Sequence, residues 1–352
     1  MIFTDAALLI IIGILLFELI ILIHEGGHFV TAKLCGVKVN EFALGMGPKL
    51  IKFKKGETLY SLRLFPIGGF CAMEGEDSES EDERAFVNKK VWQRMIIVVA
   101  GAVMNIILGL VLMMITLAPN KYFASSTVAV FSDNSTSSQQ LKVGDEIKEI
   151  NGYDIITSTD MSFAFATAKS NKLSMTVKRD GEYVNLTDVQ FPTVESDGKE
   201  ILQLDFKVAA IENNFGTLVS QTFLSTVSTV RMVWASLAGL VTGQFGLNEV
   251  SGPVGMTSAI SQATASGLET SFWDGLNNLI YVMMIITVNL GVVNLLPIPA
   301  LDGGRLVFLI IEAVRRKPIK PEHEGYVHAV GMLILFAFMI IISIKDVIQL
   351  IF

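Results

Sequence analysis

The chain has 352 residues, of which 51% are apolar and only 17% are charged, against roughly 25% charged in an ordinary globular protein. This balance excludes a disordered chain and a purely soluble fold. Asp and Glu number 34 against 27 Lys and Arg, so the net charge of −7 leaves no basic excess for nucleic acid phosphates. The two cysteines, Cys35 and Cys71, show neither CxxC spacing nor a disulfide framework. We therefore expect a membrane protein that binds no nucleic acid.

Four segments are apolar over about the 20 residues that a helix needs to cross the hydrocarbon of a bilayer. These expected transmembrane helices are Ala6–Ile23, Met95–Leu117, Leu279–Leu296 and Val327–Ile344. The first has no positively charged start and no small-residue cleavage site, so it is not interpreted as a signal peptide. The sequence thus predicts a polytopic α-helical membrane protein with four transmembrane helices.

Lys and Arg are concentrated between the first two spans and between the last two. Residues 29–94 hold eleven of them and residues 305–326 hold five, whereas the much longer segment 118–278 holds ten. Because short basic loops stay in the cytoplasm, both dense segments are expected there. The N-terminus and residues 118–278 are then extracytoplasmic.

Between the first two spans, Val37–Met73 has the pattern of short strands, with turns at Gly45–Pro48, Lys55–Glu57 and Pro66–Gly69. This predicts a small membrane-associated β-sheet at the cytoplasmic face. Parts of it are apolar enough to dip into the membrane, provided that other protein covers their backbone groups. An edge of such a sheet could receive an extended peptide. The acidic stretch Glu74–Glu83 is interpreted as a solvated loop.

The extracytoplasmic region divides in two. Short β-rich runs separated by Gly, Asn and Asp predict an α+β domain, within which Leu141–Ile155 resembles the signature loop and strand of bacterial PDZ domains. Such domains bind peptide termini by strand addition. The next segment is expected to form an amphipathic helix on the outer membrane surface, rather than a fifth span, and a Gly-rich stretch. The expected parts are residues 1–36, 37–94, 95–118, 119–210, 211–276, 277–326 and 327–352.

The chemistry is concentrated at the end of the first span, where residues 24–28 read H-E-G-G-H, an H-E-x-x-H motif. On a helix this spacing puts His24 and His28 on the same face, one turn apart, so that both can bind one zinc. Glu25 then lies beside the water that reacts. Three ionisable residues contiguous with an apolar helix are costly in a bilayer and favour a functional role. The alternative is an interfacial cluster past the end of the helix.

A catalytic zinc normally has three protein ligands, so a third ligand must come from elsewhere in the chain. The candidate is Asp302, which lies in the sequence N-L-L-P-I-P-A-L-D-G-G of residues 294–304. Prolines and glycines break the third span there, and irregular backbone at membrane depth is tolerated only where it lines a protein cavity. The alternative for Asp302 is the N-cap of a helix that begins at Gly303.

Taken in order, these motifs resemble the site-2 protease family. They are H-E-x-x-H in the first span, a GxGP turn in a membrane-associated sheet, a central PDZ-like domain and N-x-x-P-x-P-x-L-D-G-G near the third span. The order fits the bacterial RseP/RasP-type intramembrane zinc metalloproteases with one PDZ domain, over nearly the whole chain. Gly26 and Ala102 depart from the family pattern, which usually has a bulkier residue and a proline there. Neither departure removes a catalytic group.

The resemblance implies zinc as the cofactor, with His24, His28 and Asp302 as its ligands and Glu25 as general base and acid. The implied reaction is hydrolysis of a peptide bond within the membrane or at its edge. A substrate helix must first unwind into a strand, because its backbone is otherwise occupied by internal hydrogen bonds.

The resemblance also assigns Asn289 and Asn294 to holding the substrate backbone extended beside the sheet edge. The implied substrates are single-pass membrane proteins, either anti-sigma factors or remnant signal peptides, in regulated intramembrane proteolysis. The implied location is the bacterial cytoplasmic membrane, with the PDZ-like domain outside. There the domain would exclude substrates whose ectodomains are untrimmed.

Other polar residues of the spans have weaker interpretations. Glu18 lies on nearly the same helix face as Glu25, and a water path to the metal and a place in the bundle interior are about equally favoured. His323 and His328 have no partner at ligand spacing, so both are interpreted as interfacial. Asn105 is expected to hold two helices together rather than touch substrate.

Two other function classes compete with a protease. A zinc transporter would also carry histidines in its spans, but it would not need Glu25 or a PDZ-like domain. A catalytically silent scaffold would keep the PDZ-like domain and tolerate the loss of Glu25 or Asp302. Both residues are present, which favours the protease.

Overall fold

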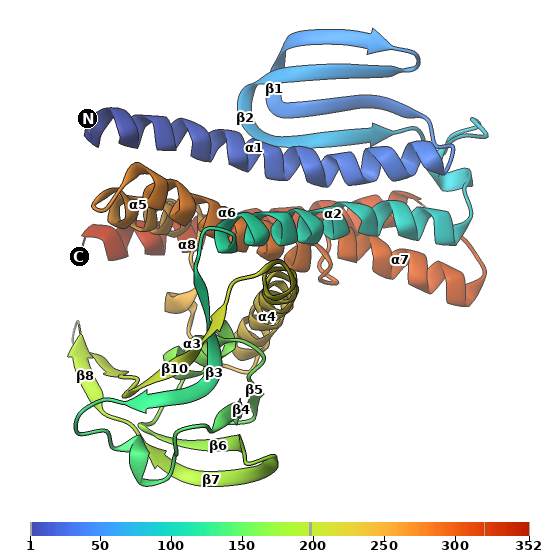
Figure 1. Cartoon of the computed structure of the whole chain (residues 1–352). Helices are drawn as coiled ribbons and strands as arrows, with labels where there is room; N and C mark the ends of the chain where they lie inside the picture. The colour runs from blue at the N-terminus through green and yellow to red at the C-terminus, as the bar shows by residue number, and fades with distance from the viewer. Residues whose placement is uncertain (1, 197–198, 320, 352) are drawn as a thin grey trace. The chain divides into compact units, whose positions relative to one another are not determined.

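The computed structural model describes residues 2–196, 199–319 and 321–351 (Figure 1). The chain forms two compact units. Unit 1 comprises Met1–Leu112 and Leu237–Phe352, and unit 2 comprises Met113–Ser236. The middle of the chain is therefore an insertion between the two halves of unit 1.

Long apolar helices make up most of unit 1, because a helix satisfies its own backbone groups where no water can do so. They are α1 (Ile2–Leu34), α2 (Val91–Leu117, which continues into unit 2), α5 (Pro253–Leu268), α6 (Phe272–Asn294), α7 (Asp302–Arg315) and α8 (Pro321–Ile351), with the 3₁₀ turns η1 (Phe86–Asn88) and η3 (Leu247–Glu249). Helix α1 continues through the H-E-x-x-H motif and ends shortly before Gly36, whose φ is +70°. The motif thus lies inside a helix and not past its end.

Five helices of the described chain are long and apolar enough to cross a membrane, one more than the four expected. They are Ala6–Leu34, Val91–Leu117, Phe215–Val241, Phe272–Asn294 and His323–Leu350. The additional candidate is α4 (Phe215–Val241), which the sequence analysis interpreted as a surface helix. Two of its hydroxyl groups, those of Thr226 and Thr229, donate hydrogen bonds to carbonyls of the same helix.

The directions of the helices in unit 1 follow from their closest contacts. Helices α1 and α6 run the same way, and α2 runs against both. The pairs that establish this are Leu9 with Gly275 and Gly13 with Leu279 for α1 and α6, and Ala102 with Gly291 and Gly109 with Val288 for α2 and α6. The chain therefore leaves α2 and enters α6 at the same end of these helices.

Ion pairs at the other end of unit 1 join its two connecting segments. The ion pair of the buried Arg94 with Glu312 links the start of α2 to α7. Arg305 of α7 contacts Glu76 and Asp77, which follow β2. The α1–α2 connection and the α6–α8 connection therefore lie at one end, as the distribution of basic residues predicts.

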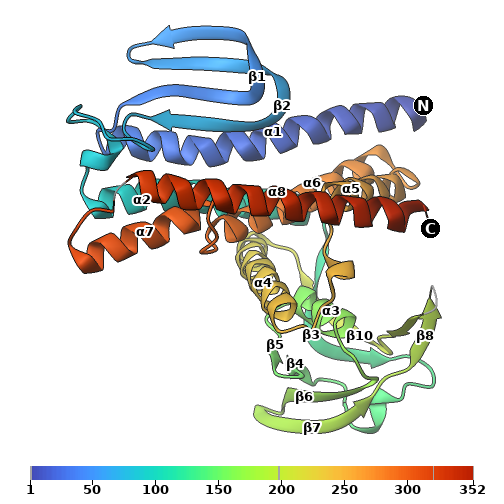
Figure 2. The same cartoon turned by 180° about the vertical axis from the view of Figure 1, so that it is seen from behind.

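Strands β1 (Val39–Lys55) and β2 (Thr58–Met73) form a folded-over hairpin along α1, as Figures 1 and 2 show. Glycines at positive φ bend both strands, Gly45 and Gly47 in β1 and Gly68 in β2. The first half of β1 consequently pairs with both halves of β2. The four antiparallel segments lie in the order 65–73, 39–46, 59–63 and 49–55. Among the described residues, segment 65–73 pairs on one side only and is an edge of this sheet.

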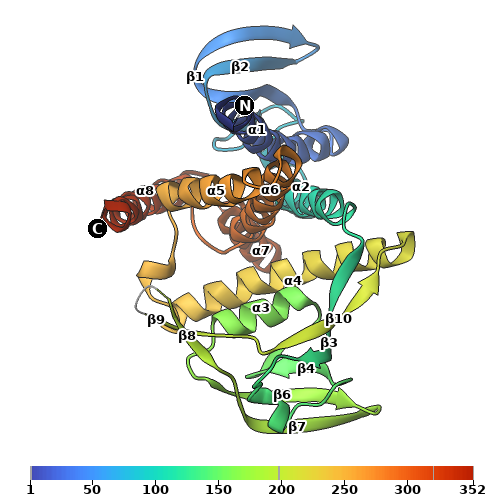
Figure 3. The same ribbon diagram turned by 60° about the vertical axis from the view of Figure 1, so that its left-hand side comes forward.

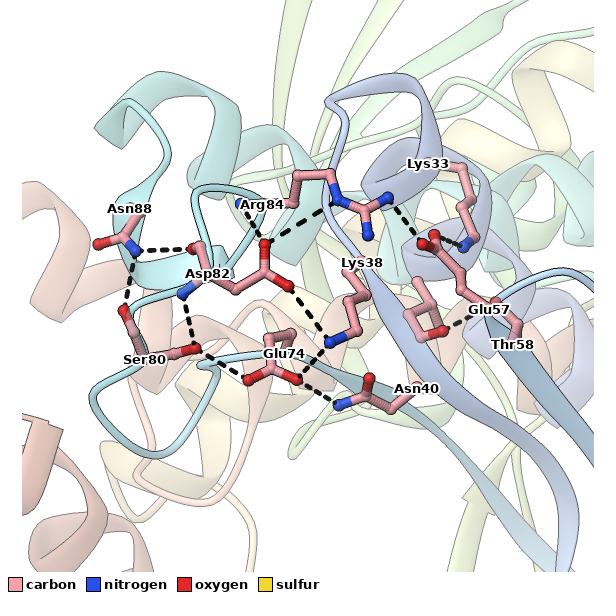
Figure 4. A network of polar contacts seen from close by, with 11 residues as sticks. Lys33, Lys38, Asn40, Glu57, Thr58, Glu74, Ser80, Asp82, Arg84 and Asn88 are labelled. Carbon is pink, nitrogen blue, oxygen red and sulfur yellow. Dashed lines mark hydrogen bonds and ion pairs between the residues drawn. The ribbon is translucent and has the colours of Figure 1, made fainter.

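The acidic loop after β2 is largely exposed, as expected of a solvated loop, and polar contacts also attach it to the sheet. Figure 4 shows the polar network, which includes Lys33, Lys38, Asn40, Glu57, Thr58, Glu74, Ser80, Asp82, Arg84 and Asn88. At its centre Lys38 forms ion pairs with Glu74 at 3.3 Å and with Asp82 at 3.2 Å. A hydrogen bond from Asn40 is the main cause that lowers the pKa of Glu74. Residues around the start of β1 therefore balance part of the loop's charge.

Residues 253–268 form helix α5, which the sequence analysis did not predict; the Gly-rich stretch that it expected, residues 244–255, precedes most of this helix. Pro253 opens the helix at a position that needs no backbone N–H. Small residues then let α5 approach α6, since a Cβ on Gly267 would lie only 2.6 Å from the Cα of Gly275. The helix packs through close backbone contact rather than a broad apolar face, so its sequence shows little hydrophobic pattern.

Unit 2 is an α+β body whose helix α3 packs on β3 and β9 (Figure 3). Its elements are β3 (Tyr122–Phe131), η2 (Ser137–Gln139), β4 (Glu146–Ile150), β5 (Tyr153–Asp154), α3 (Ser158–Ala166), β6 (Lys172–Arg179), β7 (Glu182–Gln190), β8 (Thr193–Ser196), β9 (Lys199–Leu202) and β10 (Phe206–Glu212). The main sheet has the antiparallel order β10-β3-β4-β6-β7, with β5 paired to β4, and β8 and β9 form a separate hairpin. Strands therefore form where the β-rich runs predicted them.

Two polar contacts organise unit 2. In the loop before β4, Asp145 is buried and accepts two hydrogen bonds from Arg179, each 2.7 Å long.

On α4, Ser228 donates a 2.6 Å hydrogen bond to Asp160 of α3, and Arg231 lies 3.5 Å from the same carboxylate. The polar face of α4 is therefore occupied by contacts within unit 2.

Candidate metal and catalytic site

Three potential metal ligands meet at one point in unit 1. They are His24 and His28 of α1 and Asp302, the first residue of α7. Oδ2 of Asp302 lies 3.3 Å from Nε2 of His24 and 3.4 Å from Nε2 of His28, and the two Nε2 atoms are 3.4 Å apart. Ligands bound tetrahedrally to zinc at about 2.0–2.1 Å are separated by about 3.3–3.4 Å. The nearly equilateral triangle therefore has the size that a zinc ion requires.

Hydrogen bonding determines which nitrogen of His28 faces this triangle. Its Nδ1 lies 2.8 Å from the backbone carbonyl of Ile97 on α2. A carbonyl only accepts, so Nδ1 carries the proton and Nε2 directs a lone pair toward Asp302. Oδ2 of Asp302 is itself buried and has no hydrogen-bond donor among the described residues. A cation at the centre would satisfy these converging acceptors, so the residues present fit a zinc ion.

Two glycines allow α1 and α2 to meet closely at the site. A Cβ on Gly101 of α2 would overlap Nε2 of His28 and would lie 2.8 Å from Cε1 of His24. A Cβ on Gly27 of α1 would lie 2.6 Å from the carbonyl oxygen of Ala100. Gly26, in contrast, has nothing within 4 Å of its would-be Cβ. The imidazoles thus lie against bare backbone of α2, and only one glycine of the motif is required by packing.

The turn that follows the end of α6 positions Asp302. The chain turns back through residues 295–301, with Ala300 at a φ of +81°, and α7 begins at Asp302. Gly303 and Gly304 lie directly on this turn, where a Cβ would overlap the carbonyl oxygens of Leu296 and Ile298. The residue at the N-cap is Leu301, so the alternative of Asp302 as an N-cap does not hold.

Glu25 lies between the three ligands and the edge of the sheet. Its side chain is near those of His24, His28 and Asp302, and the backbone N–H of Cys71 approaches it from segment 65–73. The Cγ of Glu25 is 3.4 Å from the position of a Cβ on Gly69 in the same segment. The acidic group of the motif thus faces both the metal-ligand triangle and the edge segment 65–73 of the sheet.

Of the two predicted substrate-binding asparagines, one reaches the ligand triangle. Nδ2 of Asn294, the last residue of α6, lies 3.4 Å from Nε2 of His24. Asn289 is exposed on the same helix. Glu18 is buried on α1, and neither of its carboxylate oxygens has a hydrogen-bond partner among the described residues.

The remaining histidines and Asn105 have the following places. Nδ1 of His328 accepts a 3.0 Å hydrogen bond from the N–H of Ala300 and thereby supports the turn before Asp302, and His323 is exposed. Neither belongs to the metal-ligating cluster found in the described residues. Asn105 is fully buried on α2, with its amide 3.2 Å from Nδ1 of His24. The sequence analysis gave this asparagine no place at the site.

Two imidazoles, a carboxylate and a neighbouring glutamate within a helical membrane protein define the class of membrane-embedded metallohydrolases. Comparison with known proteins is more specific. The family model "Peptidase family M50" matches residues 12–338. A protein of Clostridium acetobutylicum named as a zinc metalloprotease is 39% identical over 346 residues, which cover 96% of this chain and 97% of the relative. The regulator of sigma-W protease RasP of Bacillus subtilis is 30% identical over an alignment of 421 positions, gaps included, which covers 96% of this chain and 98% of the relative.

The chain therefore belongs to peptidase family M50, and it is a RasP-like intramembrane zinc metalloprotease.

Proposed function

We propose that this protease hydrolyses peptide bonds within transmembrane segments of single-pass membrane proteins. In this proposal His24, His28 and Asp302 hold the zinc, and Glu25 is the general base and acid. The observation that carries the ligand assignment is the triangle of side-chain atoms with edges of 3.3–3.4 Å. Oδ2 of Asp302, one corner of this triangle, accepts no hydrogen bond from the described residues.

The chemistry is divided between the metal and Glu25. When bound, zinc lowers the pKa of water and polarises a carbonyl. Glu25 accepts the proton of the attacking water and returns it to the amine that leaves when the peptide bond breaks. Its position against segment 65–73 supports this role, because a peptide that added to that edge would run beside it.

The sheet edge supports an extended substrate. An added strand along residues 65–73 would hydrogen-bond its backbone there, which compensates for the helical bonds that the substrate loses on unwinding. We assign Asn294, and with it Asn289, to binding the same backbone. An apolar cavity of about 760 Å³ between α1, α5 and α6, with Pro66 in its wall, offers space for apolar side chains of a membrane segment.

We further propose that four helices cross the membrane and that α4 does not. An even number of crossings between α2 and α6 is needed, because the chain leaves one and enters the other at the same end. Helix α4 alone would make one crossing, and its polar face is already engaged with Asp160. Unit 2 would then be extracytoplasmic in a bacterial cytoplasmic membrane, with a PDZ-like part that filters substrates by ectodomain size or binds their termini.

The test of the reaction compares the native protein with Glu25→Gln, both purified in detergent with their zinc counted. The substrate is a single-pass membrane peptide with a short ectodomain. We expect cleavage by the native protein only and one zinc in both forms, since the amide of a glutamine side chain cannot take a proton from water. Glu79→Gln, in the exposed acidic loop, is the matched control and should cleave normally. Equal cleavage by Glu25→Gln would refute the assignment of the base.

The test of the topology uses single cysteines labelled by a membrane-impermeant maleimide in intact cells, in a background with both native cysteines replaced by alanine. Asn134, Gln244 and Lys317 are exposed positions in unit 2, after α4 and after α7. Four spans predict labelling from outside at Asn134 and Gln244 but not at Lys317. Protection of Gln244 until the cells are permeabilised would show that α4 crosses.

A further inference from the structure

The buried amide of Asn105 is placed against a metal ligand and lacks a partner for its oxygen. Its Nδ2 lies 3.2 Å from Nδ1 of His24, and its Oδ1 has no hydrogen-bond partner among the described residues. The side chain is completely buried. A buried amide oxygen without a partner costs about 1–3 kcal/mol, so this arrangement needs an explanation.

The location of the proton on His24 explains the arrangement of the Asn105 amide. If Nε2 of His24 binds the metal through its lone pair, the proton of the neutral ring is on Nδ1. That N–H needs an acceptor, and the NH₂ end of an amide is a donor. The two ends of a carboxamide have almost the same shape, so its hydrogen bonds decide which end faces a neighbour. Turning the amide of Asn105 gives Nδ1 an acceptor and gives Oδ1 a donor at once.

We propose that Asn105 is a positioning residue of the metal site, whose Oδ1 accepts the hydrogen bond from Nδ1–H of His24. It keeps the ring in the tautomer that directs Nε2 toward Asp302. The carbonyl of Ile97 does the same for His28, so one face of α2 supplies the acceptors for both histidines. This inference rests on the proposed ligand roles of the two histidines.

The surroundings of Asn105 favour this role over that of a simple helix contact. Thr287 of α6 donates its hydroxyl to the backbone carbonyl of Asn105, and the Cα side of Gly291 lies against its Cβ. These contacts fix the backbone and the first side-chain atom and leave the amide directed at His24. If the side chain served only to join α2 to α6, its amide would hydrogen-bond to α6 rather than to His24.

Zinc affinity tests the proposal without any use of activity. The dissociation constant is measured in detergent by competition with a chromophoric chelator for the native protein, Asn105→Leu and Asn105→Asp. Leu keeps the volume but offers no acceptor, whereas Asp has the shape of Asn and only accepts. Loss of such an outer partner typically weakens metal binding about 10–100-fold. We expect that loss for Leu and native or tighter binding for Asp.

Controls separate this role from a structural one. Thr116→Val removes a buried polar group further along the same helix and should leave the zinc affinity unchanged. The visible spectrum of the Co²⁺ form should change in Asn105→Leu and stay native-like in Asn105→Asp, because it reports ligand geometry. Native affinity in the Leu variant, or equal weakening in both variants, would overturn the proposal.

His28→Ala distinguishes failure of this inference from failure of the proposed function. If the native protein binds one zinc and His28→Ala loses it, the ligand set stands whatever Asn105 does. If His28→Ala retains native zinc affinity, the ligand assignment itself is wrong.

Discussion

Adjacent glycines of the H-E-x-x-H motif should respond oppositely to the same substitution. Gly26→Ala introduces a methyl group with nothing within 4 Å, whereas Gly27→Ala puts it 2.6 Å from the carbonyl oxygen of Ala100. Both changes gain the helix preference of Ala over Gly, at most about 1 kcal/mol. Because that gain is common to both, the difference between the variants isolates the cost of overpacking, about 1–3 kcal/mol.

The same overlap should disturb the metal site. An ordinary contact begins near 3.4 Å, so α1 and α2 must separate by 3.4 − 2.6, or about 0.8 Å. A displacement of that size along the bond would stretch the 2.8 Å hydrogen bond between His28 and the carbonyl of Ile97 to about 3.6 Å. At 3.6 Å it is no longer a hydrogen bond. We therefore expect Gly27→Ala to lose zinc as well as stability.

Thermal unfolding in detergent and zinc content of the purified variants measure both effects. At about 2–4 °C per kcal/mol, Gly27→Ala should melt roughly 2–12 °C below Gly26→Ala. Gly26→Ala should retain the native zinc content and melt at or above the native temperature. Equal melting temperatures, or native zinc in both variants, would refute the view that only Gly27 is required by packing.

Three further predictions concern other contacts. Gly101→Ala should prevent zinc binding, measured by metal analysis, because its methyl group overlaps Nε2 of His28; stoichiometric zinc in this variant would contradict the site geometry. Arg305→Gln leaves the largely buried Glu76 without its partner and should destabilise unit 1 by about 3–5 kcal/mol in denaturant unfolding, whereas Arg315→Gln, exposed on the same helix, should change little. Burial alone would raise the pKa of Glu41, but hydrogen bonds, first from Ser61, lower it to about 2 from an ordinary 4.5. Since the folded pKa is depressed, this stabilisation is present above about pH 4.5 and is lost as the pH falls toward 2. Pepsin cleavage within residues 41–63 should therefore rise over that range, and Glu41→Gln should be cleaved readily already at pH 4.5; the same pH profile in both proteins would exclude Glu41 as the cause.

The sequence predicted those structural features that depend only on residues close together in the chain. The apolar runs predicted α1, α2, α6 and α8, because hydrocarbon forces a chain without other partners into a helix. The spacing of His24 and His28 needed only the helical repeat. Glycines and prolines likewise indicated the turns of the β1–β2 hairpin and the break before Asp302.

Prediction was incomplete where the determining partner is distant in sequence. Helix α5 packs through Gly267 against Gly275, a backbone contact that leaves no hydrophobic pattern. Glu74 reads as one more acid in an acidic loop until Lys38 is found beside it. Length and composition made α4 a fifth candidate span, whereas its contact with Asp160 is visible only in the folded unit.

The sequence by itself determined the class of protein, the helix that carries the histidines, and Asp302 as the candidate third ligand. Only the tertiary structure decided how these side chains meet, because their distances depend on three helices packing at once. It brought Ile97 and Asn105 of α2 to the outer nitrogens of His28 and His24, over 69 and 81 residues of chain. Hydrogen-bond partners so far apart leave no periodic trace in a sequence, since each is fixed by helix packing and not by local backbone geometry.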